Sequence, residues 1–129
     1  MSTTVRLEIP PSVYALWVPT RKRTRFGYSV QGRARSQVYE AWLATTLPIL
    51  RGIPPLTLPA SIVIEVVGGQ GWRINRDLDN AEKAIIDALV TAGRLPDDST
   101  QYLQRKLTVY TEPPGGRRRS TAHVLLTCE

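Results

Sequence analysis

The segment SIVIEVV at residues 61–67 constrains the fold most, because five of its seven residues are both apolar and β-branched. Such a run predicts a central β-strand that is covered on both faces. Residues 68–71, three of which are glycine, predict a flexible loop after this strand. Apolar side chains then recur at helical spacing over residues 78–92, and Gly93 is a suitable residue to end that helix.

Three further strands and a second helix are expected around this unit. Residues 3–9 alternate apolar and polar side chains, as in a half-buried strand, and residues 33–47 show helical spacing. Residues 102–111 and 120–127 predict two strands joined as a hairpin, whose PPGG turn and three arginines form a basic tip. Residues 12–30 predict a long loop. The order β-α-β-α-β-β predicts an α+β fold with the helices on a mixed four-stranded sheet.

Length and charge limit the class of protein. A chain of 129 residues predicts one domain over residues 1–129. Its 17 basic and 11 acidic residues give a formal net charge of +6, which favours nucleic acid as the partner over an anionic membrane surface. No apolar stretch approaches the roughly 20 residues of a transmembrane helix, and residues 1–11 do not form a signal core. We therefore expect a cytoplasmic protein that contacts no membrane.

The few cysteine and histidine residues limit the kind of metal site. Cys128 and His123 are the only residues of their types, so a zinc site of the usual cysteine and histidine ligands is excluded. Any metal must have oxygen ligands, which favours Mg²⁺ or Mn²⁺. We interpret His123 as structural, and Cys128 either as packed beside Leu126 or as free at the terminus.

Four aspartates are crowded around the helix expected at residues 78–92. Asp77 and Asp79 stand where the glycine loop enters this helix, and Asp97 and Asp98 follow its end. The two pairs converge only if the chain folds back along the helix.

A lysine lies on the same helical face. Lys83 follows Asp79 by one turn, and Asp87 comes one turn later. Hydrolysis of a phosphodiester needs an activated water, neutralised phosphoryl oxygens and a stabilised leaving alkoxide, and divalent ions held by carboxylates supply all three. A lysine beside the phosphate stabilises the developing charge or orients the water. Spacing alone favours a structural interpretation instead: an aspartate N-cap, an ordinary ion pair and an Asp-Asp-Ser turn.

Over residues 76–98 the chain resembles the RusA family of Holliday-junction resolvases. The family signature is approximately R-D-L-D-N-x-x-K, then D-A-L, a glycine and D-D; the matching segments are RDLDNAEK (76–83), IDAL (86–89), AG (92–93) and PDD (96–98). Residues 9–12 (IPPS) resemble the N-terminal P-P-S element of the family. Tyr14 departs from the family pattern, which usually has an asparagine at this position.

The resemblance implies a crossover junction endodeoxyribonuclease that acts in DNA recombination and repair. Members of the family are homodimers that depend on Mg²⁺, use no organic cofactor and resolve four-way junctions by paired cuts. Many are encoded by phages or prophages, so the resemblance implies action in the cytoplasm of a bacterial cell. A two-fold dimer matches the two-fold symmetry of a junction.

The resemblance also implies roles for individual residues. The expected metal ligands, which are also catalytic, are Asp77, Asp79 and Asp98. Lys83 is the expected catalytic lysine. Asn80 and Asp97 are expected to support the ligands without binding the metal, and Asp87 is expected to make a structural or interface hydrogen bond.

Basic residues outside the helix are candidates for DNA contact: Arg21, Lys22, Arg23, Arg25, Arg73, Arg76, Arg117, Arg118 and Arg119. A solvated charge run is the alternative for residues 21–25. Trp72 either wedges between bases at a branch point or packs on its own domain or a dimer partner. Two other functions remain open: a non-catalytic nucleic-acid-binding module whose aspartates cap a helix, and a nuclease acting on flaps, forks or RNA.

Overall fold

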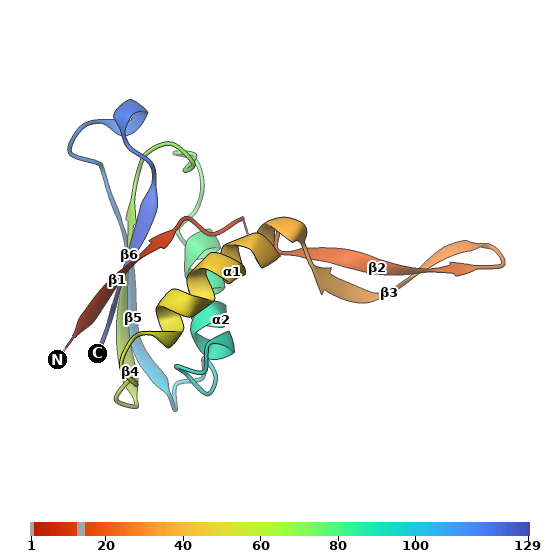
Figure 1. Cartoon of the computed structure of the whole chain (residues 1–129), viewed down its shortest axis with the longest axis horizontal. Helices are drawn as coiled ribbons and strands as arrows, with labels where there is room; N and C mark the ends of the chain where they lie inside the picture. Colours follow the sequence, from red (N-terminus) through yellow and green to blue (C-terminus); the bar gives the residue numbers. More distant parts are fainter. Residues whose placement is uncertain (1, 13–14) are drawn as a thin grey trace.

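A β-sheet and two helices form two layers, and a two-stranded ribbon extends away from them (Figure 1). This computed structural model describes residues 2–12 and 15–129, and it describes only the backbone of residues 20–22 and 28–33. The elements are β1 (Thr3–Glu8), β2 (Trp17–Thr24), β3 (Gly27–Arg35), α1 (Gln37–Arg51), β4 (Ala60–Val67), α2 (Asp79–Thr91), β5 (Leu103–Thr111), the 3₁₀ helix η2 (Arg117–Arg119) and β6 (His123–Cys128). In the described part of the chain, no helix is long and apolar enough to cross a membrane.

The sheet is mixed and four-stranded, as expected, with the strand order β1-β6-β4-β5. β4 runs parallel to β5 and antiparallel to β6, so the predicted hairpin of residues 102–111 and 120–127 is wrong. The turn sequence between these strands favours local pairing. However, the apolar strand β4 lies between them and gains a partner along each edge.

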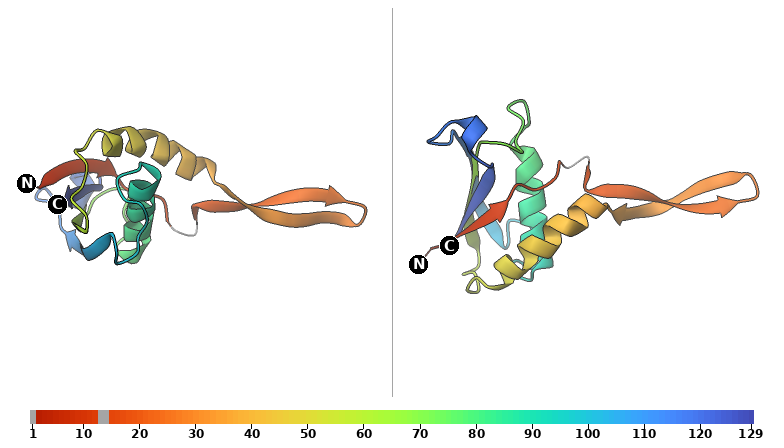
Figure 2. Two further views of the ribbon diagram at one scale, coloured as in Figure 1. Left: turned by 90° about the horizontal axis from the view of Figure 1, so that it is seen from below. Right: turned by 45° about the horizontal axis from the view of Figure 1, so that its top comes forward.

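Both helices cover the same face of the sheet (Figure 2). Ile62, Ile64 and Val66 of β4 are buried beneath them, whereas Val63 on the opposite face is 39% exposed. The prediction that this strand is covered on both faces is therefore wrong. Apolar residues of this run therefore lie on the exposed face of the sheet as well as on the buried one.

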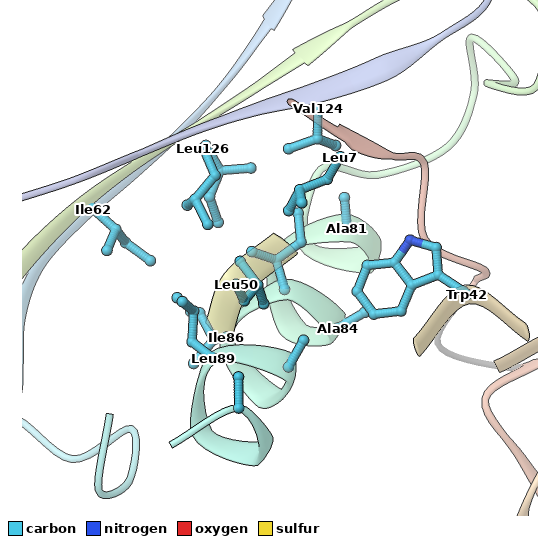
Figure 3. Packing of buried hydrophobic residues seen from close by; sticks show 14 of the residues in the cluster. Leu7, Trp42, Leu50, Ile62, Ala81, Ala84, Ile86, Leu89, Val124 and Leu126 are labelled. Carbon is cyan, nitrogen blue, oxygen red and sulfur yellow. The ribbon is translucent and has the colours of Figure 1, made fainter. Parts of the chain in front are cut away.

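Side chains from the sheet and from both helices meet in one core (Figure 3). Leu89 of α2 and Leu50 of α1 are completely buried there. α1 continues through Pro48 to Arg51, beyond the end predicted at residue 47, because this last turn places Leu50 in the core. α2 ends at Thr91, followed by Ala92 and Gly93, as expected.

Residues 17–35 form an antiparallel hairpin of β2 and β3, which we call the basic arm; the remaining described residues form the body. Figures 1 and 2 show the arm extending away from the body. The prediction of a long loop over residues 12–30 is wrong for this segment. The predicted helix at residues 33–47 also begins later, at Gln37, because β3 continues to Arg35 and the Ser36 hydroxyl accepts a hydrogen bond from the N–H of Tyr39 (3.1 Å).

Candidate functional site

The N-terminus of α2 carries two aspartates that do not cap it. Its N-cap position is Leu78, and no side chain there accepts a hydrogen bond from the helix. Within the described part of the chain, no hydrogen bond or ion pair engages the carboxylates of Asp77, Asp79 or Asp98. The structural interpretation of Asp77 or Asp79 as a side-chain cap therefore fails. The negative charge of Asp79 in the first turn still interacts favourably with the helix dipole.

Asp97 behaves differently from these three. Its Oδ1 atom accepts a hydrogen bond from the backbone N–H of Ser99 at 2.7 Å, so it closes a turn. Hydrogen bonds from the Ser99 side chain and backbone hold the pKa of Asp97 below its usual value. The turn interpretation thus fits Asp97.

The chain folds back along α2, as convergence of the two aspartate pairs requires. Asp98 lies beside the middle of the helix, in a pocket of about 200 Å³ lined by Glu82, Lys83, Ile86, Asp87, Asp98 and Lys106. Lys83 Nζ lies 3.5 Å from Asp87 Oδ2 in an ion pair one helical turn apart. The structure therefore brings Asp98 to the predicted catalytic lysine, and Asp87 has an ion pair where we expected a hydrogen bond.

The sequence alone does not predict a role for two residues of this pocket, Glu82 and Lys106. Glu82 Oε1 accepts a hydrogen bond from the Thr108 hydroxyl (3.2 Å) and lies 3.8 Å from Lys106 Nζ. Lys106 and Thr108 come from β5, which pairs parallel with β4. No local pattern in the sequence indicates this pairing, although Glu82 lies next to Lys83 in the motif.

A second hollow, of about 540 Å³, lies at the N-terminus of α2 and contains Asp77; it is lined by Ser12, Gly71, Arg73, Asn75, Arg76, Asp77 and Asn80. The Ser12 hydroxyl donates a hydrogen bond to Asn80 Oδ1 at 3.2 Å. The IPPS and RDLDN segments, 64 or more residues apart in the sequence, therefore meet at one place. Tyr14 lies outside the described residues.

Two arginines that are expected to contact DNA also hold the loop after β4. Arg76 donates a hydrogen bond to the Pro10 carbonyl (2.8 Å), and its guanidinium lies 4.5 Å from the centroid of the Trp72 ring. Burial lowers the pKa of Arg76. Arg117 donates to the Trp72 carbonyl at 2.7 Å. Trp72 is 4% exposed, so it packs on its own domain and does not present a wedge.

The loop after β4 is also held by its own backbone. Gln70 donates to the Ser120 carbonyl and accepts from the Ala122 N–H, each at 2.8 Å. These bonds fix a segment that we expected to be flexible. Of the other predicted DNA contacts, Arg73, Arg118 and Arg119 are exposed, as are Arg23 and Arg25 of the arm. The side chains of Arg21 and Lys22 lie outside the described residues.

A third hollow, of about 260 Å³, lies between the base of the arm and α2. It shares Asp87 and Asp98 with the pocket that contains Lys83. The base of the arm contributes Trp17 and Arg35 to it, and α1 contributes Tyr39. Burial and the nearby charge of Asp87 raise the pKa of Tyr39.

The donor chemistry of the expected ligands fits a hard divalent cation, since the carboxylates of Asp77, Asp79 and Asp98 form no ion pair or hydrogen bond with the described residues. Over residues 2–12 and 15–129, however, no three acidic, histidine or cysteine side chains are grouped closely enough to hold a metal ion.

Cys128 is buried in the core, and burial raises the pKa of its thiol to about 11. His123 has its Nδ1 atom 3.3 Å from the Thr121 carbonyl.

No protein-family model matches the chain, and no curated protein matches it either. The resemblance to the RusA family therefore rests on the residues quoted above.

Proposed function

We propose that this protein is a Mg²⁺-dependent endodeoxyribonuclease that resolves four-way DNA junctions as a homodimer. The observation that carries the proposal is the position of Asp98, which returns along α2 to the pocket of Lys83, one turn from Asp79. There Asp98, whose carboxylate forms no ion pair or hydrogen bond with the described residues, shares a pocket with a lysine. This combination suits phosphodiester hydrolysis better than it suits helix capping.

In this proposal, Asp77, Asp79 and Asp98 are the residues that would hold Mg²⁺, and the ion would supply an activated water and neutralise phosphoryl oxygens. Lys83 binds the scissile phosphate and stabilises its developing charge. Asp87 keeps the Lys83 side chain extended along the helix through their ion pair. Asn80, which is hydrogen-bonded to Ser12, positions the turn that carries Asp77 and Asp79. A two-fold dimer directs one such site at each of two opposing strands.

The test is cleavage of a labelled synthetic four-way junction and of a matched linear duplex, with Mg²⁺ or with EDTA. We expect symmetric, metal-dependent cuts in the junction alone. Asp79→Asn should reduce cleavage by at least about 100-fold while binding stays equal or tightens, because a charge that faces phosphate is removed. Glu8→Gln removes an exposed carboxylate from β1 and serves as the matched control, with unchanged cleavage.

A second candidate function is a non-catalytic nucleic-acid-binding module. It is favoured by the finding that no three candidate ligands are grouped in the described residues. This module would bind junction and duplex but cut neither with any divalent ion, and that result would overturn the nuclease. Cuts in flaps or forks but not in four-way junctions would keep the nuclease and change its substrate.

A further inference from the structure

Charge is divided unevenly between the basic arm and the body. The arm holds six of the 17 basic residues, Arg21, Lys22, Arg23, Arg25, Arg33 and Arg35, and none of the 11 acidic ones. The rest of the chain therefore has 11 basic and 11 acidic residues, a formal net charge of zero. The net positive charge of the molecule belongs to the arm alone, so the arm is the element that attracts a polyanion.

The arm also has the shape of a groove-binding element. Its strands pair antiparallel from Trp17↔Arg35 to Thr24↔Gly27, with an irregularity between Thr20 and Arg21. The eight residues of β2 span about 27 Å at the rise of an antiparallel strand. A two-stranded ribbon fits the major groove of B-form DNA, which is about 12 Å wide, but not the deep, narrow major groove of A-form RNA.

The tip of the arm presents an aromatic side chain to solvent. Phe26 is 95% exposed, and the guanidinium of Arg25 lies 5.9 Å from its ring centroid. The Thr24 hydroxyl donates to the Gly27 carbonyl (2.9 Å) and accepts from the N–H of Phe26 (3.3 Å), which fixes the turn. The tip therefore offers an apolar surface beside a cation, a pair suited to a base edge and a phosphate.

The base of the arm opens onto the candidate site. Trp17 and Arg35 line the same hollow as Asp98. Nucleic acid that follows the arm is therefore led towards the pocket of Lys83.

We propose that the basic arm lies in the major groove of a DNA duplex that leads away from the cut, with Phe26 in apolar contact with bases at its far end. The role of the duplex as one arm of a junction rests on the proposed function; groove binding by the arm does not. Since 27 Å corresponds to roughly eight base pairs, the contact extends about that far from the branch point.

The test measures binding in EDTA, where cleavage plays no part. For the wild type and for Arg23→Ala/Arg25→Ala, the affinity for a linear DNA duplex is measured across a salt series. The slope of log K against log salt concentration is negative, and the double variant should reduce its magnitude by about 2, because two phosphate contacts are lost. Arg6→Ala/Arg105→Ala removes two exposed charges from the body and should leave the slope unchanged.

Two further measurements test the groove and the tip. Shortening all junction arms from 14 to 5 base pairs (design lengths chosen to bracket roughly eight) should weaken wild-type binding and affect the double variant far less. Phe26→Ala should weaken duplex binding about tenfold, and Phe26→Leu, which keeps an apolar side chain, should restore most of it. Circular dichroism of each variant should match that of the wild type.

Several outcomes would overturn the arm proposal: equal slopes in the two double variants, equal loss on an RNA duplex, or a double variant that changes oligomeric state and not salt dependence. The last result would make the arm a clasp between two copies of the chain. These measurements need no cleavage. A protein that never cuts DNA but shows the predicted slopes would therefore support the proposal for the arm and contradict the proposed nuclease activity.

Discussion

The basic arm and the body of this molecule have divided charge and burial between them. The body buries Leu89, Ile64 and Leu126 completely and has a formal net charge of zero. The arm carries the whole net charge, and its large described apolar side chains are exposed, among them Val18 at 44% and Phe26 at 95%. The difference indicates that the body maintains the fold whereas the arm contributes little buried surface to it, so substitutions in the two regions should have different effects.

The largest expected contrast is in stability. Leu89→Ala should lower the free energy of unfolding by about 2–5 kcal/mol, because it leaves a cavity in a fully buried site. Val18→Ala should change it by less than about 0.5 kcal/mol, because Val18 lies at the surface of the arm. Urea unfolding followed by circular dichroism measures both. An equal loss in the two variants would show that the arm packs on a surface and is not free of the body.

Glycines at positive φ sharpen the contrast. At Gly69 (φ +151°) a Cβ atom would lie 2.6 Å from the Ser120 carbonyl oxygen, whereas at Gly27 (φ +121°), by the arm tip, it would meet nothing within 4 Å. Gly69→Ala should destabilise the body by about 2 kcal/mol. The new side chain strains the backbone at residue 69, and it also forces the backbone of Ser120 to move. Gly27→Ala adds strain to the arm turn alone and should leave the unfolding midpoint of the body unchanged. A matching midpoint shift in both variants, measured by thermal denaturation, would argue against independent regions.

The sequence predicts the body better than the arm for a physical reason. Burial of one face imposes periodicity, as in β1 and α2, and such periods are visible in the chain. The strands of the arm cover no core, so their sequence has no alternation, and Pro19 further obscures β2. The pairing of β4 with both β5 and β6 was also missed, since it is decided by distant segments and not by the turn residues between β5 and β6.

The candidate site divides along the same line. The row of Asp79, Lys83 and Asp87 follows from helical spacing alone, and the structure keeps it on α2. The return of Asp98 to this row depends on the loop after the helix, and the approach of Lys106 depends on strand register. Residue spacing encodes neither feature. For this reason the sequence does not show whether the two aspartate pairs converge, and it does not predict the position of Lys106.

The smallest expected effect lies at the joint between the two regions. Arg35 Nη1 of the arm lies 3.8 Å from Glu40 Oε1 of α1, and both side chains are well exposed, at 37% and 57%. Glu40→Gln should therefore cost less than about 0.5 kcal/mol in water and nothing measurable in 1 M salt, because exposed ion pairs are weak and screened. The guanidinium of Arg35 still lies 5.8 Å from the Tyr39 ring centroid, a contact that salt weakens less. Paired urea titrations at low and high salt measure the difference. A loss above about 1 kcal/mol that persists in salt would mean that this pair sets the angle of the arm, and that arm and body unfold as one unit.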